Sequence, residues 1–322
     1  MSATRSTGQT PMSSANDLPR GYRLYRKRIA RCRTPNQRNR VHIALESYMT
    51  PLEVRYFARA SANDPPDSPE RHWIARLDAY MRPRPAAQAE FVRRGMLRAV
   101  SRYSAATGLS SDKTLLVCFA GVFHRLMMPT AAFLDCLDPA RYEVVLLRDF
   151  TRTAFSKGIE PLGRDFFDMM RSLRVLLETD AYARTVALGV CSGALPALLA
   201  AIMLGFDHGI SIAGVDFPEF ATWLGDWGVD ASRHEALLAS RPEPFPDLVQ
   251  VYSADTGKDA AAAAALQGRV PSRLWAEGNC GPNVLASVLT TGRLRGFMSR
   301  LLESDEGVGA TQSSVRAVET NS

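Results

Sequence analysis

Residues 112 to 303 alternate between short apolar, β-rich runs and stretches with the spacing of amphipathic or buried helices. Continuous apolar runs that end in Gly or Asp are typical of strands buried on both faces of a parallel sheet. Strands that alternate with helices indicate crossover connections, so we expect a doubly wound, mostly parallel α/β sheet. The expected strands cover residues 114–121, 142–149, 185–190, 209–217, 247–255 and 272–279, and one closing helix covers 284–302.

The rest of the chain has a different composition. Residues 1–40 hold ten Lys or Arg and one acidic residue, whereas the remainder holds 29 basic and 32 acidic residues. We predict a disordered basic tail over 1–40 and a disordered polar tail over 304–322. Between them we expect a helical preface over 41–110, followed by the α/β domain over 111–303. The second helix of the preface is expected to contain Phe91, Met96, Leu97, Val100 and Tyr103.

Bulk properties exclude several classes of protein. The net charge of +6 comes from the tail, so it predicts no nucleic-acid-binding surface on the α/β domain. The basic segment 22–33 is interpreted either as a solvated tail or as a contact to an anionic membrane or nucleic acid. The longest apolar run has 12 residues, below the roughly 20 that span a membrane. Five scattered cysteines without a CxxC pair favour reduced thiols in the cytoplasm, with no metal and no cofactor.

The segment Leu188–Ala194 has the pattern of a nucleophile elbow, G-x-Nuc-x-G, between an expected strand and an Ala/Leu-rich helix. The two glycines are needed because side chains there would collide at a sharp, strained turn. They are Gly189 and Gly193, which places Cys191 at the tip of the turn. A register with Ser192 at the tip would lack both glycines and is therefore rejected.

Two interpretations of Cys191 remain open. In the first, Cys191 is a thiolate nucleophile at a helix amino terminus, where the helix dipole favours negative charge. The oxyanion donors would be the Ser192 N–H and the Val122 N–H, and His124 and Arg125 in the same loop would contact the substrate. In the second, Cys191 is an inert buried cysteine in a fold without activity, since cysteine is among the residue types most often buried.

A catalytic triad on such a fold runs in the order nucleophile, acid, histidine. The acid is expected after the strand 247–255, where Asp255 and Asp259 are candidates, although Asp259 also suits a helix N-cap. The histidine is expected in the loop 277–284, which contains none. All the histidines precede this loop, at positions 42, 72, 124, 208 and 234.

Residues 114–303 resemble the α/β-hydrolase superfamily, and more narrowly hydrolase-like proteins found with bacterial surface-polysaccharide genes. In that pattern the elbow residue is usually serine, here Cys191. The resemblance implies that Asp259 is the acid, and that the histidine position is occupied by Pro282. The matching segments are FAGVFHRLMMPTAAFLD, LLRDFTRTAFSKGIEPLG, GVCSGALPALLAA and GNCGPNVLASVLTTGRLRGFMSRLL.

Two functions follow as hypotheses. The first is an acyl ester or thioester hydrolase, or an acyltransferase, that acts on an acyl or glycan substrate through Cys191. The second is a catalytically degenerate fold that serves as a binding or accessory protein in surface-polysaccharide biosynthesis. Retention of both elbow glycines favours the first, and loss of the triad histidine favours the second.

Overall fold

The computed structural model describes residues 18–81, 89–94, 97–105, 110–177 and 181–303. Its strands are β1 (Val92–Arg94), β2 (Val100–Ser104), β3 (Thr114–Phe119), β4 (Tyr142–Leu147), β5 (Arg184–Val190), β6 (His208–Ile212), β7 (Asp247–Ser253) and β8 (Arg273–Glu277). They form one sheet in the order β1-β2-β4-β3-β5-β6-β7-β8. The β1–β2 and β2–β4 pairs are antiparallel, and every pair from β4 to β8 is parallel.

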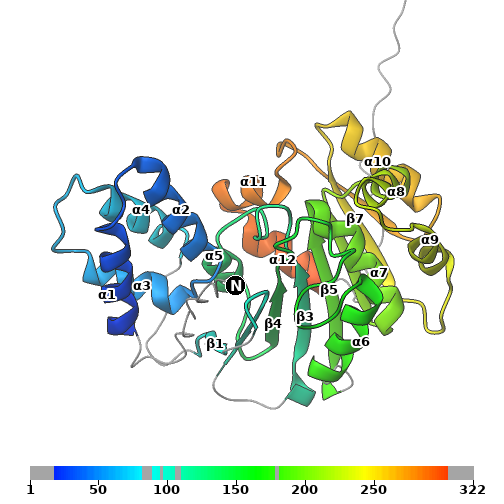
Figure 1. Cartoon of the computed structure of the whole chain (residues 1–322), viewed down its shortest axis with the longest axis horizontal. Coiled ribbons are helices and arrows are strands. Elements are labelled where there is room, and N and C mark those ends of the chain that lie inside the picture. Colours follow the sequence, from blue (N-terminus) through cyan, green and yellow to red (C-terminus); the bar gives the residue numbers. More distant parts are fainter. Residues whose placement is uncertain (1–17, 82–88, 95–96, 106–109, 178–180, 304–322) are drawn as a thin grey trace, which may run out of the picture.

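Helices cover both faces of this sheet (Figure 1). They are α5 (Thr130–Asp135), α6 (Phe166–Leu177), α7 (Ala194–Leu204), α8 (Phe217–Asp226), α9 (Ser232–Ala239), α10 (Gly257–Gln267), α11 (Val284–Thr290) and α12 (Leu294–Leu302). The doubly wound, mostly parallel sheet expected from the sequence is therefore confirmed, and the fold is α/β-hydrolase-like.

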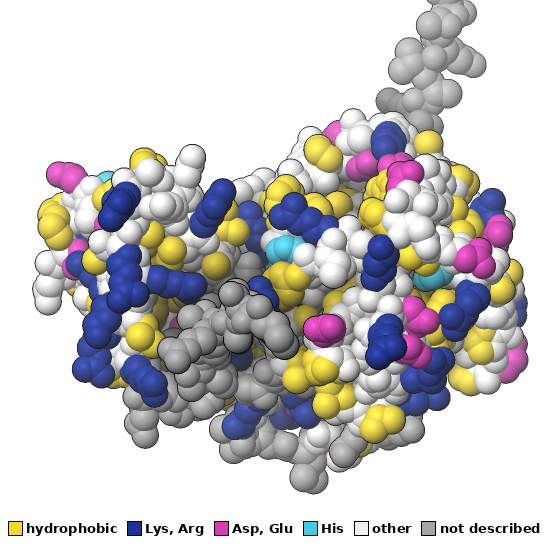
Figure 2. Space-filling model, viewed as in Figure 1, with side chains coloured by type: hydrophobic (Ala, Val, Ile, Leu, Met, Phe, Trp, Pro, Cys, Tyr) yellow, Lys and Arg dark blue, Asp and Glu magenta, His cyan; other side chains and the backbone are white. Residues whose placement is uncertain are grey.

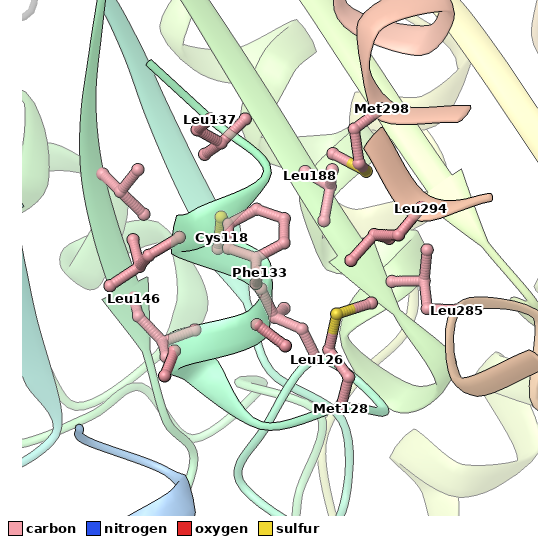
Figure 3. Close-up of a cluster of buried hydrophobic side chains, with 14 of the residues drawn as sticks. Cys118, Leu126, Met128, Phe133, Leu137, Leu146, Leu188, Leu285, Leu294 and Met298 are labelled. Carbon is pink, nitrogen blue, oxygen red and sulfur yellow. The ribbon is translucent and has the colours of Figure 1, made fainter. Parts of the chain in front are cut away.

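The core has two layers because side chains alternate across each strand. In β3, Leu116 and Cys118 belong to one apolar cluster, and Leu115 and Val117 belong to the other. Figure 3 shows the first layer, in which Cys118 of β3 lies among side chains of α5, α11 and α12. The second layer lies between the sheet and helices that include α6 and α7.

The expected helix over residues 91–103 is wrong. This segment contains β1 and β2, and β2 adds to the sheet beside β4, with Val100 opposite Leu147. The apolar residues fit a helical spacing, but backbone hydrogen bonds to β4 decide the conformation, and local sequence does not encode that partner. The closing helix over 284–302 is divided into α11 and α12 by Gly292, whose φ of 71° ends the first of them.

The amino-terminal region also differs from the expected tail. Four helices precede the sheet, namely α1 (Leu18–Ile29), α2 (Pro35–Glu46), α3 (Pro51–Ala60) and α4 (Pro69–Asp78). Residues 18–40 are thus mainly helical, because Tyr25 and Ile29 of α1 pack in an apolar cluster with Phe57 and Trp73. The predicted disordered tails over 1–17 and 304–322 lie outside the described residues. None of the helices described is long and apolar enough to cross a membrane.

Polar contacts attach the four-helix unit to the sheet domain. Arg148 follows β4 and is fully buried. Its guanidinium donates a 2.8 Å hydrogen bond to the Ser101 hydroxyl and a second hydrogen bond to the backbone oxygen of Ser47. Its guanidinium lies 4.1 Å from the centre of the Tyr48 ring. Arg55 of α3 pairs with Asp135 of α5 at 2.7 Å. These buried bonds fix where the helical unit lies against the sheet.

The helical unit should lose stability in acid because of His42. This side chain stacks on Trp73 with ring centres 4.1 Å apart, and burial lowers its pKa to about 4, with smaller effects from Glu70, which raises it, and from nearby arginines. An unfolded histidine has a pKa of about 6.5, so unfolding takes up a proton between these values. Stability is complete above pH 6.5 and falls by up to about 3 kcal/mol as the pH approaches 4.

Chemical unfolding at pH 7 and pH 4.5 measures this effect. Wild type should lose more stability than His42→Gln between pH 7 and pH 4.5, because only wild type has this histidine to protonate. An equal loss in both proteins would contradict the assignment.

Candidate active site

The elbow has the geometry expected from the sequence. Cys191 has a φ of 51°, a left-handed conformation that costs a non-glycine residue free energy. A Cβ on Gly189 would lie 2.0 Å from the carbonyl oxygen of Gly193. A Cβ on Gly193 would lie 2.5 Å from the carbonyl oxygen of Phe119. Both glycines are therefore required, and they place Cys191, which is partly exposed, between β5 and α7.

The loop after β3 lies directly beside the elbow. Phe119 at the end of β3 is in register with Gly189 of β5, so both strands end at the same edge of the sheet. A Cβ built on Gly121 would lie 3.2 Å from the Cβ of Cys191. The loop closes with a 2.8 Å bond from the His124 N–H to the Gly121 oxygen. Val122 follows Gly121 in this turn, and Ser192 follows Cys191, so the two expected oxyanion donors come from adjoining segments.

His124 lies in the same loop, in a left-handed conformation with a φ of 61°. Its ring is 4.8 Å from the Phe150 ring, and its Nδ1 is buried with no hydrogen-bond partner among the described residues. Burial lowers its pKa, the charge of Arg152 lowers it further, and Asp149 opposes these effects. His124 is therefore neutral at neutral pH and belongs to the loops that surround the elbow.

Arg125 has a different role from the expected substrate contact. Its guanidinium pairs with Glu46 of α2 at 2.7 Å, and Glu46 is buried and also accepts a 2.8 Å bond from the Trp73 indole. This ion pair joins the loop beside Cys191 to the helical unit. The unit thus supports the candidate site, which sequence spacing did not predict because 79 residues separate the partners.

Of the two candidate acids, Asp255 is the one that contacts the loop after β8. Its carboxylate accepts a 2.8 Å bond from the Cys280 N–H in the loop after β8. Asp259 lies in the first turn of α10, where burial raises its pKa and its Oδ2 has no partner in the described chain. The structure therefore brings Asp255, and not Asp259, to the loop in which Pro282 occupies the expected histidine position.

The other histidines are held elsewhere. His208 begins β6, at the end of the sheet opposite the elbow, and its Nδ1 lies 2.9 Å from the Asp247 backbone oxygen. His234 of α9 is buried among Phe166, Phe167 and Phe220. His42 and His72 belong to α2 and α4. No group of three or more His, Cys, Asp or Glu in the described chain could hold a metal ion.

Sequence reasoning missed the loop that follows β4. Asp149 is buried and accepts backbone N–H bonds from Thr151, Thr153 and Phe155 at 2.7–2.9 Å, which shapes this loop beside the one that holds His124. Arg152 lies in the exposed part of the loop that follows β4, and the Phe150 side chain in the same loop is 39% exposed. The signal that could have located this loop is the parallel pairing of β3 with β4, because this pairing brings the loops that follow both strands to the same edge of the sheet.

Comparisons with known proteins find only distant structural likenesses. No family model matches the chain, and no curated protein matches it either. Among solved structures, an esterase of the bacterial hormone-sensitive lipase family is 14% identical with a TM-score of 0.49, over 91% of this chain and 98% of that one. The serine hydrolase FphF of Staphylococcus aureus is 10% identical with a TM-score of 0.46, over 66% and 99%.

A dienelactone hydrolase from Anabaena variabilis is 12% identical with a TM-score of 0.43, over 67% of this chain and 97% of that one. Nothing about the chemistry of the present site follows from identities this low.

Proposed function

We propose that the protein transfers or hydrolyses acyl groups through a thioester formed on Cys191. The observation that carries this proposal is the strained elbow itself. A left-handed non-glycine residue is costly, yet Cys191 is held in that conformation by two glycines that no other residue can replace. It is also partly exposed, and it adjoins the turn after β3 that contains Gly121 and Val122. An inert core cysteine would need none of these features.

The acylation step can proceed without a triad histidine once the thiol of Cys191 has lost its proton to solvent. The anionic sulfur of Cys191 attacks the acyl carbon, and the oxyanion accepts bonds from the N–H groups of Val122 and Ser192. The C–S bond of the donor then breaks and its thiolate leaves, so that the acyl group is on Cys191. Water or an acceptor hydroxyl next attacks the acyl carbon, its proton passes to solvent, and the Cys191 sulfur leaves as thiolate.

The missing histidine favours thioester donors over oxygen esters. An alkoxide leaving group must be protonated as it departs, which is the task of the triad histidine. A thiolate is stable enough in neutral water to leave without a general acid. The second half of the reaction gains no such advantage, because water or a hydroxyl must then be activated. We therefore expect acylation of Cys191 to be faster than its deacylation.

Trapping the acyl-enzyme tests the proposal. After the protein is mixed with acetyl-coenzyme A, intact mass spectrometry should show one acetyl group, and peptide mapping should place it on Cys191. Neutral hydroxylamine should remove it, as expected for a thioester. The buried Cys118 serves as the internal control, because it is fully buried and should stay unmodified. Absence of any hydroxylamine-sensitive adduct would contradict the proposal.

A second candidate function is a binding or accessory protein, as in surface-polysaccharide biosynthesis. The observation that favours it is the loop after β8, which carries Pro282 and is fastened by Asp255 through backbone contacts alone. The partner would be an anionic membrane or nucleic acid, met by the basic side of α1. The exposed basic side chains there are Arg20, Arg23, Arg26, Lys27 and Arg28, and Figure 2 shows Lys and Arg gathered over this part of the molecule.

The buried apolar residues of α1 limit this second function. Tyr25 and Ile29 pack inside the helical unit and are not available for insertion into a bilayer. Contact would therefore be electrostatic and sensitive to salt. Binding to anionic vesicles without any acyl-enzyme would favour the accessory function over the acyl-transfer function.

A further inference from the structure

The elbow is bordered by cationic and aromatic side chains that the reaction itself does not use. Arg98 lies with its guanidinium carbon 5.1 Å from the centre of the Phe150 ring. The same ring contacts His124, whose backbone loop adjoins Cys191. Arg152 follows in the loop after β4 and acts electrostatically on His124. One side of the site therefore has an exposed arginine, Arg98, over the Phe150 ring, and a second exposed arginine, Arg152, two residues after Phe150 in the same loop.

These arginines have no acidic partner in the described chain. Neither Arg98 nor Arg152 makes a side-chain hydrogen bond or ion pair with another described residue, and both are exposed. Asp149, in the same loop as Arg152, accepts hydrogen bonds from backbone N–H groups of that loop. An exposed guanidinium beside an aromatic ring can bind a phosphate or carboxylate with two parallel bonds.

A third arginine, Arg148, adds positive charge at the end of β4, where the loop that carries Arg152 begins. Arg148 is fully buried, and its hydrogen-bond partners are the neutral groups of Ser47, Ser101 and Tyr103. Burial of a charge without a counterion costs free energy. Because the protein interior screens charges weakly, the field of the Arg148 guanidinium extends into the nearby site. The charge of Arg148 is felt at His124, which places it within range of the elbow loops.

We propose that Arg98 and Arg152 form an anion-binding subsite beside Cys191, and that the natural acyl donor carries a phosphate or carboxylate group that docks there. The binding of an acyl donor rests on the proposed function, because it presupposes that the protein transfers or hydrolyses acyl groups. The subsite itself stands on the arrangement of the arginines, Phe150 and His124. A thioester of a phosphate-bearing thiol meets both requirements, because it supplies the anion and a leaving group that needs no general acid.

Alkylation of Cys191 tests the subsite without any acyl chemistry. Iodoacetate and iodoacetamide are nearly equal in size and differ in charge. The alkylation rate with iodoacetate divided by the rate with iodoacetamide therefore reports the electrostatic potential at the sulfur. In wild type at low ionic strength this ratio should exceed that of a free cysteine peptide. Arg152→Gln should lower it about threefold, and Arg98→Gln with Arg152→Gln about tenfold. Peptide mass spectrometry assigns the alkylation to Cys191.

The matched control is Arg23→Gln, which removes one positive charge from α1, at the far side of the helical unit (Figure 1). It should leave the ratio unchanged. Inorganic pyrophosphate should slow alkylation of wild type by iodoacetamide and leave the double variant unaffected. A wild-type ratio equal to that of the free peptide, or a ratio that neither substitution changes, would overturn the subsite.

Acylation rates then separate this inference from the proposed function. Acetyl-coenzyme A should acylate Cys191 faster than the neutral thioester of N-acetylcysteamine, and the double variant should lose the preference. If neither thioester acylates Cys191 while the alkylation ratio still responds to Arg152→Gln, the proposed function fails and the anion subsite stands. Acylation without any preference for the anionic thioester would remove the role of the subsite in donor binding.

Discussion

Gly189→Ala should destabilise the protein by about 3 kcal/mol or more, and should abolish any reaction at Cys191. The added methyl group would lie 2.0 Å from the Gly193 oxygen and 2.8 Å from the Cβ of Ala197. Neither contact can be relieved by rotating a side chain. β5 and α7 would have to separate, and both are buried, with Leu188, Leu195 and other neighbours packed in the core. Urea unfolding followed by circular dichroism measures the loss.

Gly225→Ala is the matched control, because it makes the same change in α8, where no heavy atom lies within 4 Å of the added carbon. Alanine is the better helix former, so this variant should be more stable by up to about 1 kcal/mol. Equal stability of the Gly189→Ala protein and wild type would show that the elbow is more pliable than its contacts indicate.

Cys191→Ala should lower acyl-enzyme formation and turnover of acetyl-coenzyme A at least about a thousandfold, with no loss of folding stability. Alanine keeps the backbone conformation and removes only the sulfur, which is partly exposed and not part of the core. The measurements are the pre-steady-state rate of thiol release and the midpoint of urea unfolding. Residual turnover within about tenfold of wild type would exclude Cys191 as the nucleophile.

Cys191→Ser sharpens this experiment. A serine hydroxyl needs a general base, whereas a cysteine can react as a thiolate. If the site has no base, the serine variant should be as inactive as the alanine variant. Activity in the serine variant would instead identify a base, and His124→Phe would then test the one histidine that the structure places in the elbow loops.

Much of the α/β domain could be predicted because its information is local. Buried parallel strands are continuous apolar runs, so β3, β4 and β5 are visible in the sequence within a few residues. The elbow is equally visible, because two close backbone approaches demand glycine at fixed spacing around Cys191. The strained φ of Cys191 confirms the turn that this spacing predicts.

Features that depend on distant partners could not be predicted. The segment 91–103 has helical spacing, and only the free edge of β4 makes it a pair of strands. The sequence predicts a disordered tail at α1 because residues 1–40 are strongly basic. The helix is ordered because its apolar face, which includes Tyr25 and Ile29, packs in one cluster with Phe57 and Trp73.

The sequence by itself determined the parallel strands of the sheet, the elbow and the identity of the nucleophile candidate, since each depends on the residue types of one short segment. Tertiary structure decided what surrounds Cys191. It selected Asp255 over Asp259 as the acid that reaches the loop after β8, and it gave Arg125 to Glu46 of α2. It also placed Phe150 beside His124. The physical reason is that parallel strands end at a common edge, where loops far apart in sequence meet.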